Sequence, residues 1–143
     1  MIRCLAILVL LFVSTTASSA PAMQGPVTAE VIRVLDGDTF DVRAQIWVGH
    51  FIETRVRING IDTPEMRSKC LDEKDKANAA KQALEKMVLQ QTVYLIDIEN
   101  GKYAGRVLAK AQTMDGTDLA DAMIKQGYAR PYNGGKRAGW CTS

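Results

Sequence analysis

Residues 27–58 read VTAEVIRVLDGDTFDVRAQIWVGHFIETRVRI, and the architecture expected of the whole chain starts from them. Apolar and polar residues alternate on both sides of Asp36-Gly37, a pair typical of a tight turn between antiparallel strands. We therefore expect strands over Val27–Val34 and Thr39–Trp47. A third strand is expected over Phe51–Ile58, with its arginines facing away from the core, because side chains alternate between the two faces of a strand.

The remaining elements follow from turn signals and periodicity. Thr63-Pro64-Glu65 is typical of a helix start, with a cap, a proline at the first position and an acid in the first turn. Further on, we expect a longer helix over Asp72–Leu89, strands over Thr92–Ile98 and Arg106–Thr113, and a short helix over Asp118–Gln126. This order predicts a mainly β domain, a five-stranded Greek-key barrel of the OB type with two to three helices.

The first 22 residues differ in composition from the rest of the chain. A short basic start is followed by an apolar run over Cys4–Val13 and by small polar residues, the pattern of a secretory signal peptide. That run is too short to cross a bilayer core of about 30 Å, so a retained anchor is the weaker alternative. Cleavage after Ala17 or Ala22 would leave an exported, periplasmic or secreted domain, taken here as residues 23–143.

Charge and cysteine content limit the function classes. Without Arg3, the 18 basic residues become 17 against 16 acidic ones, a net charge of +1 that gives no bulk attraction to a polyanion. A candidate basic cluster remains near the end of the chain, with scattered solvated charge as the alternative. Its members are Lys125, Arg130, Lys136 and Arg137.

Cys70 and Cys141 are the two cysteines that remain after removal of the leader. We expect them to pair, because export compartments are oxidising, and two free thiols are the alternative. A structural zinc is less expected, since His50 is the one other soft ligand in the chain. A single histidine also excludes nucleases that use a histidine pair, and its position predicts a solvated loop residue.

Three short motifs place acids and arginines at the edges of the expected strands. Each alone has an ordinary explanation, such as a hairpin turn, a capped helix or a solvated arginine. Together they combine oxygen ligands suited to a hard divalent cation with planar guanidinium groups suited to a phosphate. The motifs are Asp36-Gly37-Asp38-Thr39, Arg57 followed by Asp62-Thr63-Pro64-Glu65, and Gly105-Arg106.

With Gln126-Gly127-Tyr128-Ala129, these motifs make the chain from about Val27 to Tyr132 similar to the staphylococcal nuclease (thermonuclease-like) family. The resemblance implies a Ca²⁺-dependent endonuclease on an OB-type barrel, which cleaves DNA and RNA and leaves 3′-phosphate ends. It further implies that Asp38, Asp62 and the backbone carbonyl of Thr63 hold the Ca²⁺ ion.

The resemblance also assigns the remaining site residues. It implies that Glu65 orients or deprotonates the attacking water, and that Arg57 and Arg106 hold the phosphate and offset the transition-state charge. Three further residues are candidates for substrate contacts: Lys102, Tyr103 and Tyr132.

The end of the chain, Trp140-Cys141, resembles a cysteine-containing bacterial branch of the same family, in which the second cysteine follows the Asp-Thr-Pro-Glu motif. The resemblance therefore implies a bridge that ties the tail down near the site. We expect a monomer without a stable protein partner, free of the membrane after the leader is cleaved. The alternatives are a non-catalytic OB-fold module that binds nucleic acid and a purely structural exported domain.

Overall fold

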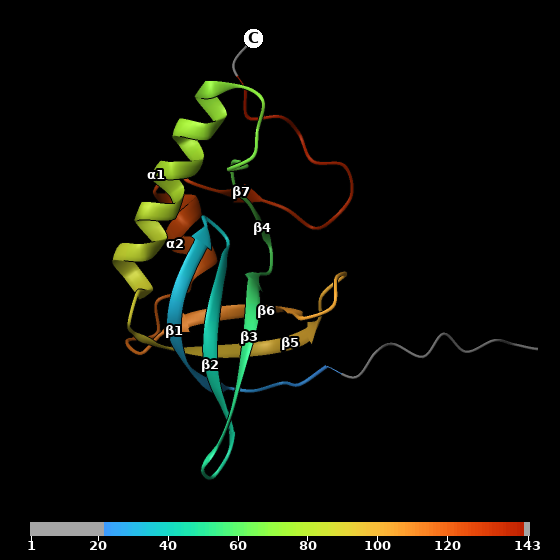
Figure 1. The fold of residues 1–143 in the computed structure, drawn as a ribbon. Coiled ribbons are helices and arrows are strands. Elements are labelled where there is room, and N and C mark those ends of the chain that lie inside the picture. Colours follow the sequence, from blue (N-terminus) through green and yellow to red (C-terminus); the bar gives the residue numbers. More distant parts are fainter. Residues whose placement is uncertain (1–21, 142–143) are drawn as a thin grey trace, which may run out of the picture.

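The structure, a computed structural model, describes residues 22–141, so the expected signal peptide lies outside the described residues except for its last position. Five long strands close into a barrel in the order β1-β2-β3-β6-β5 (Figure 1). This confirms a mainly β fold with a barrel of the OB type. In chain order the elements are β1 (Val27–Asp36), β2 (Thr39–Trp47), β3 (His50–Ile58), β4 (Ile61–Asp62), α1 (Leu71–Val88), β5 (Thr92–Asn100), β6 (Arg106–Thr113), α2 (Leu119–Lys125) and β7 (Arg130–Pro131).

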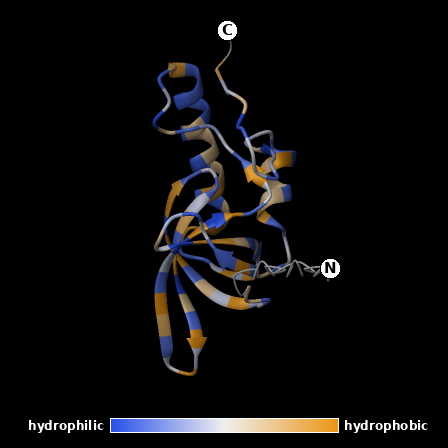
Figure 2. Ribbon diagram, turned by 90° about the vertical axis from the view of Figure 1, so that its right-hand side faces the viewer, coloured by the Kyte–Doolittle hydropathy of each residue, from blue (hydrophilic) through white to orange (hydrophobic). Residues whose placement is uncertain are grey.

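The barrel closes because β1 pairs with both β2 and β5, while β3 pairs in parallel with β6. Polar and apolar residues alternate along its strands, so that one face of each strand fills the interior (Figure 2). Fully buried side chains such as Phe40, Val56, Ile58 and Leu95 form the core. Burial of a side chain of this size stabilises the fold by about 1.5–3 kcal/mol.

Helix α1 lies across one end of β1 and buries the apolar stripe expected from the sequence (Figure 1). The turn between β1 and β2 approaches it closely at Gly37. A Cβ atom there would lie 2.7 Å from the Cβ of Ala80 and 3.1 Å from the Cβ of Thr63. Only a glycine allows this contact, which fixes the β1–β2 turn against both α1 and Thr63.

The expected helix start at Thr63 is wrong. The chain has no helix between Asp62 and Leu71, and Cys70 precedes α1 without a side-chain cap. Instead, the buried Glu73 carboxylate of α1 accepts hydrogen bonds from the Glu65 backbone N–H at 3.0 Å and from Ser68 Oγ at 2.6 Å. The following helix therefore satisfies donors of this segment, which takes an irregular path in place of a helical turn.

The last residues return to the first turn of α1. Strands β4 and β7 form a two-stranded sheet in which Asp62 is paired with Arg130. From there residues 130–141, called the C-terminal strap below, loop out and come back to Cys70, which is disulfide-bonded to Cys141 as the sequence predicted (Figure 1). Neither two-residue strand was expected, because such short segments carry no periodicity. Within residues 22–141, no helix is long and apolar enough to span a membrane.

Candidate active site

Two buried aspartates lie at the end of the barrel that faces the C-terminal strap. Asp38 lies in the β1–β2 turn, Asp62 ends β4, and each is only 1% exposed. A turn at Gly60, with φ of 87°, separates β3 from β4. A hydrogen bond of 2.8 Å from the Ile58 backbone N–H to the Asp38 carbonyl joins the two segments. Burial of two carboxylates is costly unless cations compensate for it.

Asp38 is only partly compensated. Its Oδ1 accepts hydrogen bonds from Thr39 Oγ1 at 2.7 Å and from Arg57 Nη1 at 2.8 Å. Its Oδ2 lies 2.8 Å from the same Arg57 nitrogen but has no hydrogen bond of its own to the described residues. Burial raises the pKa of Asp38 to about 7, the charge of Asp36 adds to this rise, and Arg57 opposes it. The pairing with Arg57 thus offsets the burial of the Asp38 carboxylate only in part, as expected of a ligand for a further cation.

Arg57 links Asp38 to the segment that carries Asp62. Its Nη1 binds Asp38, and its Nη2 lies 3.4 Å from the carbonyl of Ile61, the residue before Asp62. The Arg57 side chain is 18% exposed. It points away from the barrel core, as predicted, and one edge of its guanidinium group is committed to the protein.

Asp62 receives donors from the C-terminal strap. Its Oδ2 accepts hydrogen bonds from Arg130 Nε at 3.0 Å and Nη2 at 2.8 Å, and from Trp140 Nε1 at 3.0 Å. Its Oδ1 accepts from Arg137. Burial raises the pKa of Asp62, but the hydrogen bonds from Arg130, Arg137 and Trp140 outweigh this effect and hold it below its ordinary value.

Arg137 contacts three groups that the sequence assigned to metal binding and catalysis. Its guanidinium group pairs with Asp62 Oδ1 and Glu65 Oε1, and its Nη2 donates to the Thr63 carbonyl at 3.2 Å. The sequence placed Arg137 in a candidate basic cluster for polyanions. In the structure, the charges of Arg130 and Arg137 are instead paired with Asp62, so these two arginines do not form an open basic patch with Lys136.

A cleft of about 1000 Å³ runs beside these groups. Parallel pairing of β3 with β6 sets Arg57 opposite Leu108 and Arg55 opposite Arg106, so these arginines share the outer face of the barrel. The cleft collects the predicted catalytic and substrate-contact residues from four different segments. Its lining includes Arg57, Glu65, Lys102, Tyr103, Arg106, Tyr132 and Arg137.

Arg106 is free to bind an anion in the cleft. Its guanidinium carbon lies 5.0 Å from the centroid of the Tyr103 ring, a cation–π contact. Among residues 22–141 it forms no ion pair within 4.0 Å. Its positive charge therefore faces the cleft without a protein carboxylate to neutralise it.

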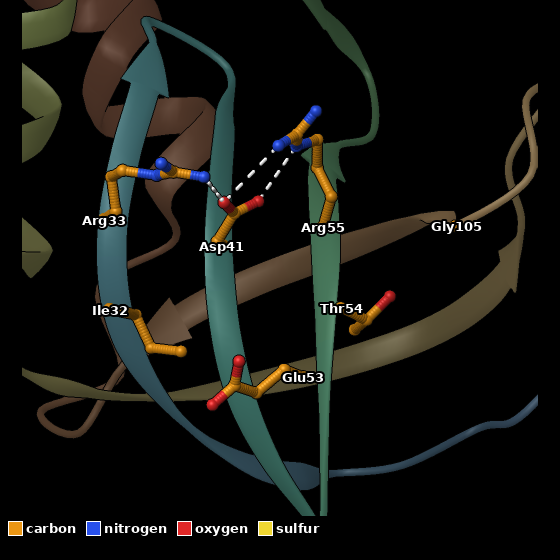
Figure 3. Close-up of a pocket in the computed structure, with 7 residues that line it drawn as sticks. All are labelled: Ile32, Arg33, Asp41, Glu53, Thr54, Arg55 and Gly105. Atoms are coloured by element: carbon orange, nitrogen blue, oxygen red, sulfur yellow. Dashed lines mark hydrogen bonds and ion pairs between the residues drawn. The ribbon is translucent and has the colours of Figure 1, made fainter.

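A neighbouring hollow of about 630 Å³ on the barrel surface has different electrostatics. There Arg33 and Arg55 both point at Asp41, and Arg55 Nε lies 2.8 Å from its Oδ1 (Figure 3). The hydrogen bond from Arg55 holds the pKa of Asp41 below its ordinary value. Because Asp41 already pairs with both arginines, this hollow offers a phosphate less uncompensated charge than the cleft does.

The donor chemistry of the site suits a hard cation. Asp38, Asp62 and the Thr63 carbonyl offer only oxygen, and one buried Asp38 oxygen lacks a hydrogen bond. Among the described residues, one group of three metal-ligand side chains lies within 4.8 Å, and two of its members are the disulfide-bonded cysteines. The carboxylates of Asp38, Asp62 and Glu65 are not gathered that closely, and Glu65 is turned toward Arg137.

Comparison with known proteins agrees with this geometry. Residues 55–138 match the family model described as staphylococcal nuclease homologue. The chain is also 27% identical, over 114 residues, to a protein named uncharacterized endonuclease from Escherichia coli and to one of the same name from Escherichia coli O157:H7. In each case the match covers 80% of this chain and 67% of the relative. The chain belongs to the staphylococcal nuclease homologue family.

Proposed function

We propose that this protein is a Ca²⁺-dependent endonuclease that hydrolyses phosphodiester bonds of DNA and RNA and leaves 3′-phosphate ends. Family membership and two relatives named as endonucleases support nuclease activity. One structural observation carries the assignment furthest. A single cleft collects Arg57, Glu65 and Arg106, and the two buried aspartates, Asp38 and Asp62, are in direct contact with residues that line it.

In this mechanism Asp38, Asp62 and the Thr63 carbonyl would hold the ion, which would supply positive charge beside the phosphate. Arg57 and Arg106 bind the non-bridging oxygens of the phosphodiester and offset the charge that develops on them in the transition state. Glu65 accepts a proton from the attacking water as its oxygen bonds to phosphorus. The bond from phosphorus to the 5′-oxygen breaks, and that oxygen takes a proton from solvent.

Plasmid DNA and RNA, incubated with the purified, disulfide-intact protein, test this function. We expect cleavage with Ca²⁺, none with a chelator, and products that polymerase extends only after phosphatase treatment. Asp62→Asn should abolish cleavage. Asp41→Asn is the matched control, because it makes the same chemical change at the neighbouring hollow and should retain activity.

The alternative, a non-catalytic OB-fold module, predicts a different outcome in the same assay. Such a module would retard DNA or RNA on a gel and leave both intact under every metal condition. Asp38 favours the enzyme, because one of its buried oxygens has no hydrogen bond to the described residues, and a reader of nucleic acid gains nothing from such a group. Export, which we also propose from the amino-terminal composition, is tested by recovery of the processed protein outside the cytoplasm.

A further inference from the structure

The guanidinium group of Arg137 occupies acceptors that the proposed mechanism needs for its ion and its water. It binds Asp62 Oδ1, the Thr63 carbonyl and Glu65 Oε1 at the same time. We propose that Arg137 is an internal counter-cation that competes with the divalent metal ion for this site, held there by the disulfide-bonded C-terminal strap. The inference rests on the function proposed above and adds a means of controlling it.

The two cations exclude each other for reasons of distance and charge. A Ca²⁺ ion binds its oxygens at about 2.3–2.6 Å, which requires their lone pairs to face the ion. Arg137 donates hydrogen bonds to two of the expected ligands, Asp62 and the Thr63 carbonyl, and so occupies these lone pairs. A guanidinium group held against the same oxygens would also repel the ion. The metal therefore binds fully only when the Arg137 side chain leaves.

The other strap contacts with Asp62 do not conflict with metal binding. Arg130 and Trp140 both donate to Oδ2, whereas Arg137 binds Oδ1. Departure of Arg137 alone would thus free one oxygen while the carboxylate stays oriented by the other two residues. The strap divides into a part that positions Asp62 and a part that competes for it.

Anchors on both sides keep Arg137 close to the acids. Before it, β7 is paired with β4, and the strap turns at Gly134 and Gly135, which have φ of 92° and 91°. After it, Lys76 Nζ donates to the Trp140 carbonyl at 3.0 Å, and Cys141 is bonded to Cys70. Tethering of this kind raises the effective concentration of the guanidinium group at the site.

Arginine suits this role because it does not lose its charge within the pH range of proteins. A change of pH therefore cannot release the site by neutralising Arg137. Release requires either a higher concentration of the competing ion or a looser strap. Reduction of the Cys70–Cys141 bond would provide the second route, since it removes the covalent anchor that lies four residues after Arg137.

Calcium titration by calorimetry, without substrate, tests the proposal independently of catalysis. We expect Arg137→Ala to bind Ca²⁺ about tenfold more tightly than the wild type, the effect of losing one charge-assisted contact of about 1.4 kcal/mol. Lys136→Ala is the matched control, because it removes the same charge from the adjacent exposed position. Reduced wild-type protein should also bind more tightly than the oxidised form, and circular dichroism checks that every sample is folded.

The outcomes separate this proposal from the proposed function. Equal Ca²⁺ affinity of Arg137→Ala and Lys136→Ala would show only a general effect of charge and would overturn the competition. Weaker binding by Arg137→Ala would overturn it too, since Arg137 would then support the ion. If the wild type and Arg137→Ala both fail to bind Ca²⁺ while the fold is intact, the metal assignment itself fails, and the competition with it.

Discussion

Replacement of Asp38 by asparagine should change how stability depends on pH in the absence of metal. The carboxyl group has its pKa raised from 3.8 to about 7 by burial and by Asp36, against the attraction of Arg57. The folded state thus holds the Asp38 proton more tightly than the unfolded chain does. This contribution is fully present below about pH 4 and is lost as the pH rises through about 7. Asparagine mimics the neutral carboxyl group at every pH.

The pKa values give the size of the effect. Between pH 5 and pH 8 the wild type should lose about 2–3 kcal/mol of unfolding free energy through this one group. The Asn variant should not, so its stability relative to the wild type should rise by that amount over the same interval. Loss of the ion pair with Arg57 in the variant changes its unfolding free energy by the same amount at pH 5 and pH 8, because arginine does not titrate in this range.

Urea unfolding followed by circular dichroism, with a chelator present, measures this difference at the two pH values. Asp41→Asn is the control: Arg55 lowers the pKa of Asp41, so that its contribution is lost only as the pH falls through a value below 3.8. Its difference from the wild type should be the same at pH 5 and pH 8. A difference for Asp38→Asn that also stays constant would refute the argument that Arg57 compensates the buried Asp38 carboxylate only in part.

Three further predictions concern catalysis and stability. Arg57→Lys keeps the positive charge but loses the planar guanidinium group, so we expect the activation barrier to cleavage, measured under single-turnover conditions, to rise by about 2–4 kcal/mol. An unchanged cleavage rate would contradict the role of Arg57. Replacement of Cys70 and Cys141 by serine should cost about 4 kcal/mol by denaturant titration, because the bond closes a loop with a sequence separation of 71. Gly37→Ala should cost about 1–3 kcal/mol in thermal unfolding, because its Cβ would lie 2.7 Å from that of Ala80.

The strands of the barrel could be predicted because the sequence signals for strands and turns are local. Alternation along Thr39–Trp47 and the Asp36-Gly37 turn identify the first hairpin without knowledge of any distant contact, and the observed β2 has the same bounds. The start of α1 could not be predicted in this way. Thr63-Pro64-Glu65 has every local feature of a helix start, but a carboxylate eight residues further on, Glu73, binds the Glu65 backbone N–H instead.

In the candidate site, too, residues in local motifs could be predicted, whereas contacts between distant residues could not. Short motifs singled out Asp38, Arg57 and Asp62. In the structure Arg57 pairs with Asp38 and its Nη2 lies 3.4 Å from the Ile61 carbonyl, while Asp62 pairs with Arg130. The contact between Arg137 and Asp62 joins residues 75 positions apart, and no periodicity reports such a pair. The sequence did indicate, through the two cysteines, that the tail returns to the site, but a disulfide fixes only one point of the strap and leaves open which side chains turn inward.

The looped shape of the strap bears on what a protease could do to this protein. Residues 133–136 are exposed, and Gly134 and Gly135 lie at their centre. A cut within this tip would separate Arg137 from β7, yet the fragment would stay bound through Cys141. Release of the fragment into solution would require both proteolysis and reduction. Only then would Arg137 be removed permanently from Asp62 and Glu65.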